Sequence, residues 1–132
     1  MKRRIIPGIV LLFLAAIAAV GSRTFMAPCA HADGSFGACH WAGRTLLGLS
    51  CVLGITAVIS VCVPRARFGA YLSALPVCLL GILTPGTLID LCRSDAMRCR
   101  MVTRPAAILL FSASLLCALI GALLNTGKAK RE

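Results

Sequence analysis

The chain has 132 residues, 59% of them apolar, and its fourteen lysines and arginines against four acids give a net charge of +10. A soluble globular domain needs a larger share of charged residues on its surface, so this composition excludes that class. The basic residues lie between apolar runs and not on a face shared with aromatic residues. This excludes a nucleic-acid-binding domain and indicates contact with a lipid bilayer whose headgroups are anionic.

Four runs without charged residues are long enough to cross the hydrocarbon core of a membrane. In chain order they are residues 5–22, 45–63, 71–89 and 105–124. Because backbone groups in lipid must be hydrogen-bonded internally, each run is predicted to be a helix and not a strand. No internal repeat or linker stands out. The sequence therefore predicts an all-α, integral membrane four-helix bundle that forms a single domain over residues 1–132.

The first run also resembles a secretory signal, because basic residues precede it and small residues follow it. Its apolar stretch is long for a signal, and no clean A-x-A cleavage site follows. These two features favour an uncleaved helix. Cleavage would leave three spans in the same orientation.

Four spans place both termini on one side of the membrane. That side would carry eight basic residues: Lys2, Arg3, Arg4, Arg65, Arg67, Lys128, Lys130 and Arg131. The other side would carry six: Arg23, Arg44, Arg93, Arg98, Arg100 and Arg104. Since cytoplasmic loops are enriched in Lys and Arg, the termini are predicted to be cytoplasmic. Trp41, Arg44 and Arg104 flank spans and are predicted to lie at the membrane interface.

Small residues four positions apart predict close helix contacts within the bundle. They are Ser50 with Gly54, Ala113 with Cys117 and Gly121, and Ser114 with Ala118 and Ala122.

The eight cysteines fall into two groups. Four lie inside spans and are predicted to be packing residues: Cys51, Cys62, Cys78 and Cys117. The other four lie in the two outer loops and predict two disulfides, as in an oxidising compartment: Cys29, Cys39, Cys92 and Cys99. If the second loop is helical, Cys92 and Cys99 lie too far apart to bond each other, and each would pair with a cysteine of the first loop. If the second loop is open, Cys92 would bond Cys99 and Cys29 would bond Cys39. We favour pairing between the loops.

The outer loops also offer an alternative soft-metal or thiol-redox site, since thiolate, imidazole and thioether groups bind soft metal ions. Its candidate ligands are Cys29, His31, Cys39, His40, Cys92, Met97 and Cys99, with Met26 and Met101 nearby. Disulfide formation would remove the thiolates, and the spacing matches no specific zinc pattern. The spacings C-x9-C and C-x6-C also differ from the C-x-x-C of thiol oxidoreductases. We therefore predict no metal, no cofactor and no catalytic residue.

Several short motifs lie in the two outer loops. They are F-x-x-P-C at 25–29, D-G at 33–34, C-H-W at 39–41, P-G at 85–86, Cys92 and M-x-C at 97–99. In these motifs the chain resembles an uncharacterised bacterial family of small four-span membrane proteins, a domain of unknown function. The likeness covers most of the chain. A methionine often stands two residues before the Cys-His-Trp triplet in that family; here Gly37 does, which weakens a metal site built on loop methionines.

Some members of that family are encoded beside ABC transporters of the macrolide-exporter-like class, which implies an accessory role and no enzyme activity. The sequence thus predicts a non-enzymatic accessory or structural subunit in the bacterial inner membrane, and the resemblance implies an ABC-type transport complex as its partner. A disulfide-held extracytoplasmic cap would cover its outer end. A small transporter or pore, formed as a homo-oligomer, is a further alternative.

Overall fold

The chain was analysed as a computed structural model, which describes residues 2–26, 37–90 and 99–129. The helices in this part of the chain are α1 (Lys2–Gly21), α2 (Ala38–Cys62), α3 (Arg67–Leu83), the π-helix η1 (Cys99–Thr103) and α4 (Arg104–Ala129). The described residues form no strand. The predicted all-α class is therefore confirmed for them.

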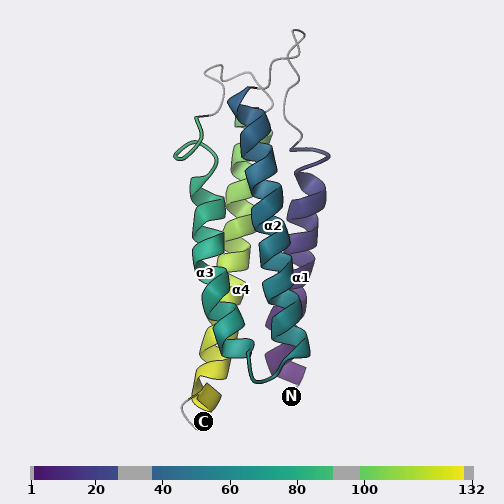
Figure 1. Ribbon diagram of the computed structural model, residues 1–132, viewed down its shortest axis with the longest axis vertical. Helices are drawn as coiled ribbons and strands as arrows, with labels where there is room; N and C mark the ends of the chain where they lie inside the picture. Colours follow the sequence, from purple (N-terminus) through teal and green to yellow (C-terminus); the bar gives the residue numbers. More distant parts are fainter. Residues whose placement is uncertain (1, 27–36, 91–98, 130–132) are drawn as a thin grey trace.

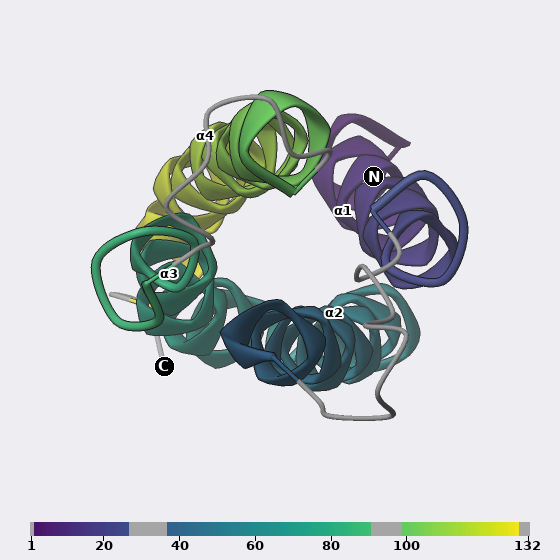
Figure 2. The same cartoon turned by 90° about the horizontal axis from the view of Figure 1, so that it is seen from above.

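The four long helices form an up-down-up-down bundle (Figure 1). The start of α1, the end of α4 and the connection between α2 and α3 lie at one end, which we call the terminal end. The end of α1, the starts of α2 and η1, and the segment that follows α3 lie at the other, which we call the loop end. Viewed along its axis, the bundle is a ring in chain order with α4 beside α1 (Figure 2).

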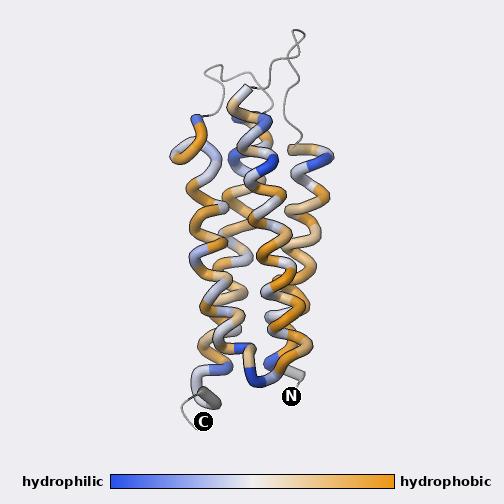
Figure 3. Tube along the Cα trace, viewed as in Figure 1, coloured by the Kyte–Doolittle hydropathy of each residue, from blue (hydrophilic) through white to orange (hydrophobic). Residues whose placement is uncertain are grey.

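Hydrophobic residues predominate along most of the length of the helices, and hydrophilic residues gather near the two ends of the bundle (Figure 3). Large apolar side chains such as Phe13, Ile55 and Leu123 are exposed on three different helices. Three helical segments, 4–21, 38–62 and 100–127, are long and apolar enough to cross a membrane. α3 is apolar but has only 17 residues. An exposed apolar girdle between polar ends fits a membrane protein, because lipid does not penalise apolar surface.

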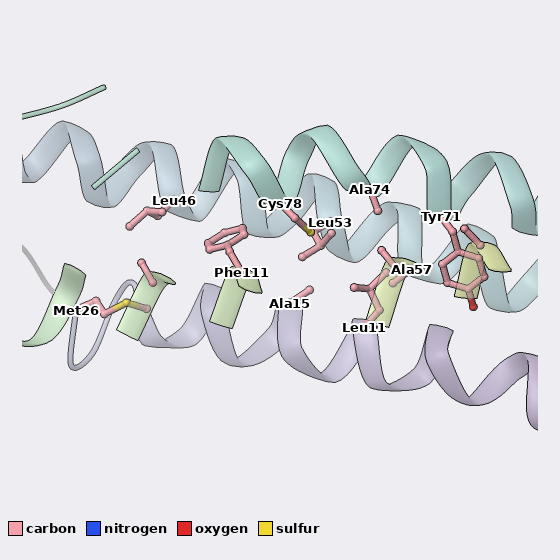
Figure 4. Packing of buried hydrophobic residues seen from close by; sticks show 13 residues of the cluster. Leu11, Ala15, Met26, Leu46, Leu53, Ala57, Tyr71, Ala74, Cys78 and Phe111 are labelled. Carbon is pink, nitrogen blue, oxygen red and sulfur yellow. The ribbon is translucent and has the colours of Figure 1, made fainter. Parts of the chain in front are cut away.

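Alanines and a few larger side chains fill the centre of the ring (Figure 4). Ala15, Ala57 and Ala74 come from three helices, and each is almost completely buried. Around them the core cluster contains Leu11, Leu46, Leu53, Met26, Tyr71, Cys78, Ala107, Phe111, Ala118 and Ala122. Small side chains on the inner faces allow the helix backbones to approach closely, which is how helices associate when lipid competes for apolar contact.

Two aromatic side chains lie on glycines across the contact between α3 and α4. The ring of Phe111 in α4 covers Gly81 in α3, and the ring of Tyr71 in α3 covers Gly121 in α4. A Cβ added to Gly121 would lie 2.6 Å from Tyr71 Cε1. Tyr71 is fully buried, and its hydroxyl has no hydrogen-bond partner in the described structure. Packing on glycine, rather than a hydrogen bond, therefore positions this ring.

Buried serine hydroxyls donate to carbonyls of their own helices. Ser50 Oγ donates to Leu46 O at 2.7 Å, and Ser60 Oγ donates to Ala57 O at 2.7 Å. Ser114, one of the small residues predicted to mediate helix contacts, is buried and donates to the carbonyl of Leu110 at 2.8 Å. Each hydroxyl thus uses its only proton inside one helix, which leaves the helix contacts to packing.

Arg67 is a buried arginine at the terminal end, where its guanidinium donates hydrogen bonds to carbonyl groups in the last turn of α2. Its Nε donates to Ser60 O at 2.9 Å, and its Nη2 donates to Val61 O at 3.4 Å. The last carbonyls of a helix have no partner within the helix, and an arginine can supply one. Arg67 therefore caps α2. The sequence had predicted only that its positive charge helps to orient the chain in the membrane.

The helix ends differ from the predicted runs at the loop end. α2 begins at Ala38 rather than at residue 45, and α3 ends at Leu83 rather than at residue 89. Pro85 has no N–H to continue α3, and Gly86 adopts a left-handed φ of 100°. The N–H groups of Leu88 and Ile89 donate to the carbonyls of Leu83 and Thr84 at 3.1 and 3.2 Å. The segment after α3 is thus a hydrogen-bonded turn instead of a further helical turn.

Candidate functional site

Of the residues predicted as disulfide partners or soft-metal ligands, the structure describes Cys39, His40 and Cys99, which lie at the loop end. Cys29, His31, Cys92 and Met97 lie outside the described residues. Cys39 and His40 are described in full, and Cys99 by its backbone in η1. Among the described side chains, no three His, Cys, Asp or Glu form a group that could hold a metal ion. The two disulfides and the alternative soft-metal site each involve residues that the structure does not describe, so both stay predictions.

The Cys-His-Trp triplet forms the first turn of α2, although the sequence analysis assigned it to a loop. Gly37 is the N-cap, and the N–H of His40 donates to its carbonyl at 2.9 Å. Successive residues of a helix point about 100° apart, so the triplet divides between three environments. Cys39 is buried, His40 is half-buried, and Trp41 is 59% exposed. The interfacial position of Trp41 stays a prediction, with which its exposure is compatible.

The two methionines near these loops also differ in environment. Met26 is buried and belongs to the core cluster, whereas Met101 is 68% exposed. Met26 therefore acts as a packing residue at the end of the bundle.

A basic pocket lies between the end of α1 and the first turns of α2. We call it the α1–α2 pocket, and it is lined by Ser22, Arg23, His40, Gly43, Arg44 and Leu47. Ser22 is buried and donates its hydroxyl proton to Ala19 O at 2.7 Å, so it forms the floor of the pocket without offering a donor. The described residues of its lining carry two guanidinium groups and an imidazole, and no carboxylate.

A second polar pocket lies between the turn after α3 and the start of α4. We call it the α3–α4 pocket, and it is lined by Gly86, Asp90, Arg100 and Arg104. The guanidinium of Arg104 lies against Gly86, where an added Cβ would be 3.2 Å from Nε. This pocket also holds two guanidinium groups, but Asp90 reduces its net charge.

The two pockets share a sequence spacing that the sequence analysis missed. C-H-W-A-G-R at 39–44 and C-R-M-V-T-R at 99–104 each place a basic residue directly after a cysteine and an arginine four residues further on. Residues four apart share one face of a helix, so each pair points into one pocket. Hydropathy alone does not reveal this similarity, because the pattern is only six residues long. A comparison of the two hairpins, α1 with α2 and α3 with α4, would have found it.

Comparison with known proteins identifies one family. Residues 11–124 match the model of DUF4418, a domain of unknown function. No curated protein and no solved structure matches the chain.

Proposed function

Because this chain belongs to the DUF4418 family, a domain of unknown function, we propose its role from the geometry: it is a non-enzymatic accessory or structural subunit of a membrane complex. The four helices would cross a bacterial inner membrane, with both termini in the cytoplasm and the loop end outside. An ABC-type transporter is the partner that the predicted accessory role favours.

The observation that carries this proposal is the contrast between the interior of the bundle and its loop end. The interior is filled by alanines, leucines and aromatic rings, and its buried serines bond to their own helices. The loop end carries two basic pockets and the exposed side chains of Phe25, Trp41 and Met101. A packed scaffold that presents polar and aromatic groups at one end suits a protein that acts by contact with another.

Site-specific photocrosslinking in native membranes tests the partner contact. A photoreactive residue at Trp41 or Met101 is expected to give one discrete adduct with a partner subunit. Matched control positions are Ile55 in α2 and Leu123 in α4, which are 61% and 74% exposed but lie further along the same helices. We expect only lipid adducts there. Equal adducts at all four positions, or none at the loop-end positions, would contradict a partner bound at the loop end.

The disulfide-held cap is a separate part of the proposal, and thiol counting tests it. The chain has eight cysteines, and two disulfides would leave 8 − 4 = 4 thiols. Alkylation of the denatured, unreduced protein should therefore add four groups by mass, and alkylation after reduction should add eight. Eight groups without reduction would rule out the cap. If the protein has eight free thiols and also binds copper or zinc, the alternative soft-metal site would be favoured.

A further inference from the structure

Two arginines in the α1–α2 pocket have no acceptor in the described protein. Arg23 and Arg44 are both exposed, and neither guanidinium group makes a hydrogen bond or ion pair with a described residue. Arg67 is different, because two carbonyls hold its guanidinium. Two like charges that line one pocket repel each other, and a bound anion would relieve this repulsion.

The nearby carbonyl groups at the end of α1 already accept hydrogen bonds from backbone N–H groups. Val20 O accepts from the N–H groups of Arg23 and Thr24 at 3.0 and 3.1 Å. Gly21 O accepts from Met26 N at 2.9 Å. These carbonyls are satisfied by the turn that ends α1, so they do not explain why two guanidinium groups line this pocket.

Aromatic side chains place the pocket at the depth of lipid headgroups. Trp41 follows His40 in the first turn of α2, and its indole meets the imidazole edge to face, with ring centroids 6.0 Å apart. Phe25 is exposed in the turn that ends α1. Exposed aromatic residues at the ends of membrane helices collect at the headgroup level. Phosphate groups of phospholipids occur at the same level.

We propose that the α1–α2 pocket binds a phosphate group, which Arg23 contacts from the turn after α1 and Arg44 from α2, while His40 forms part of the wall. Guanidinium groups suit this ligand because their planar donors match the oxygens of a phosphate in pairs. The phosphate belongs either to a phospholipid headgroup or to a soluble phosphate. Phosphate binding at this pocket does not depend on the proposed partner, so the purified chain is sufficient to test it.

The α3–α4 pocket provides an internal comparison. Among the described residues it also has two arginines, Arg100 and Arg104, but Asp90 lines it as well. Counting only the arginine and aspartate side chains of the described lining, the formal charge is +2 in the α1–α2 pocket and +2 − 1 = +1 in the α3–α4 pocket. The second pocket is therefore expected to bind a phosphate more weakly. Asp90→Asn should strengthen its binding.

Titration of the full-length chain in a neutral detergent, followed by native mass spectrometry, tests the site. The probes are phosphatidylglycerol, inorganic phosphate, and diacylglycerol as the lipid without phosphate. We expect saturable binding of phosphatidylglycerol, a loss of affinity of roughly tenfold or more in the Arg23→Gln/Arg44→Gln double variant, and no saturable binding of diacylglycerol. The matched control, Arg100→Gln/Arg104→Gln, should lose less. Saturable binding of inorganic phosphate with the same dependence on Arg23 and Arg44 would assign the site to a soluble phosphate.

Equal phosphatidylglycerol affinity in the wild type and in Arg23→Gln/Arg44→Gln would overturn the proposal, as would equal binding of diacylglycerol. Both arginines are exposed, so their replacement should leave the bundle folded, which circular dichroism can verify. If the double variant does not fold, Arg44→Gln alone serves the same purpose, and an unchanged affinity there overturns the proposal in the same way.

Discussion

Replacing Gly81 by alanine should destabilise the bundle by about 1 to 3 kcal/mol, because the added methyl group would enter the ring of Phe111. Phe111 is itself buried in the core cluster, so its ring has little space to move aside. Gly121→Ala should have a similar effect through Tyr71, whose ring covers that glycine from the opposite helix. The free energy of unfolding in mixed detergent micelles measures both effects.

The matched control for Gly81→Ala is Gly69→Ala in the same helix. An added Cβ at Gly69 meets no atom within 4 Å. Alanine is the better helix former, so this variant should be equally stable or more stable, by up to about 1 kcal/mol. Adding Phe111→Leu to Gly81→Ala should recover part of the loss, since the smaller side chain makes room for the methyl group. Equal stability of Gly81→Ala and Gly69→Ala would contradict the close contact between α3 and α4.

Replacing Arg67 by alanine should cost about 2 to 3 kcal/mol, because the change removes charge-assisted hydrogen bonds to two carbonyls at the end of α2. Arg67→Lys keeps the charge but has no planar set of donors, so its cost should lie between those of the wild type and alanine. Unfolding in the same mixed micelles is the measurement.

Arg65 provides the control for Arg67, because it lies in the same connection but is exposed. Arg65→Ala should change the free energy of unfolding by no more than about 0.5 kcal/mol. If the two alanine variants were equally stable, Arg67 would act only through its charge on the terminal side and not as a cap.

The helices of this protein follow directly from its apolar runs, whereas several of their ends do not. Residues 38–44 include His40 and Arg44, so a search for uncharged runs cannot include them in a span. The tertiary structure nevertheless extends α2 through these residues, because Cys39, Ala42 and Gly43 are buried against the bundle. At the end of α3 the T-P-G sequence was a visible sign of an irregular end. The hydrogen-bonded turn that replaces the helix there depends on backbone geometry that hydropathy does not encode.

The candidate site was predicted only in part. The sequence drew attention to the cysteines and histidines because these residue types carry chemistry, and it classed Arg44 and Arg104 as interfacial anchors. It did not connect Arg23, in the turn after α1, with Arg44 in α2, and the two share a pocket only because α1 and α2 form an antiparallel pair. Nor did it pair Arg104 with Gly86, since that contact depends on the turn after α3.

The sequence by itself determined the helical class and the approximate positions of the four apolar helices, because lipid requires long apolar segments whose backbone bonds are internal. Only the tertiary structure decided which residues come together: aromatic rings on glycines between α3 and α4, Arg67 on the end of α2, and Arg23 in one pocket with Arg44. These contacts join residues from different elements, so they depend on helix register and crossing rather than on periodicity within one helix. A pattern read along one segment does not contain that information.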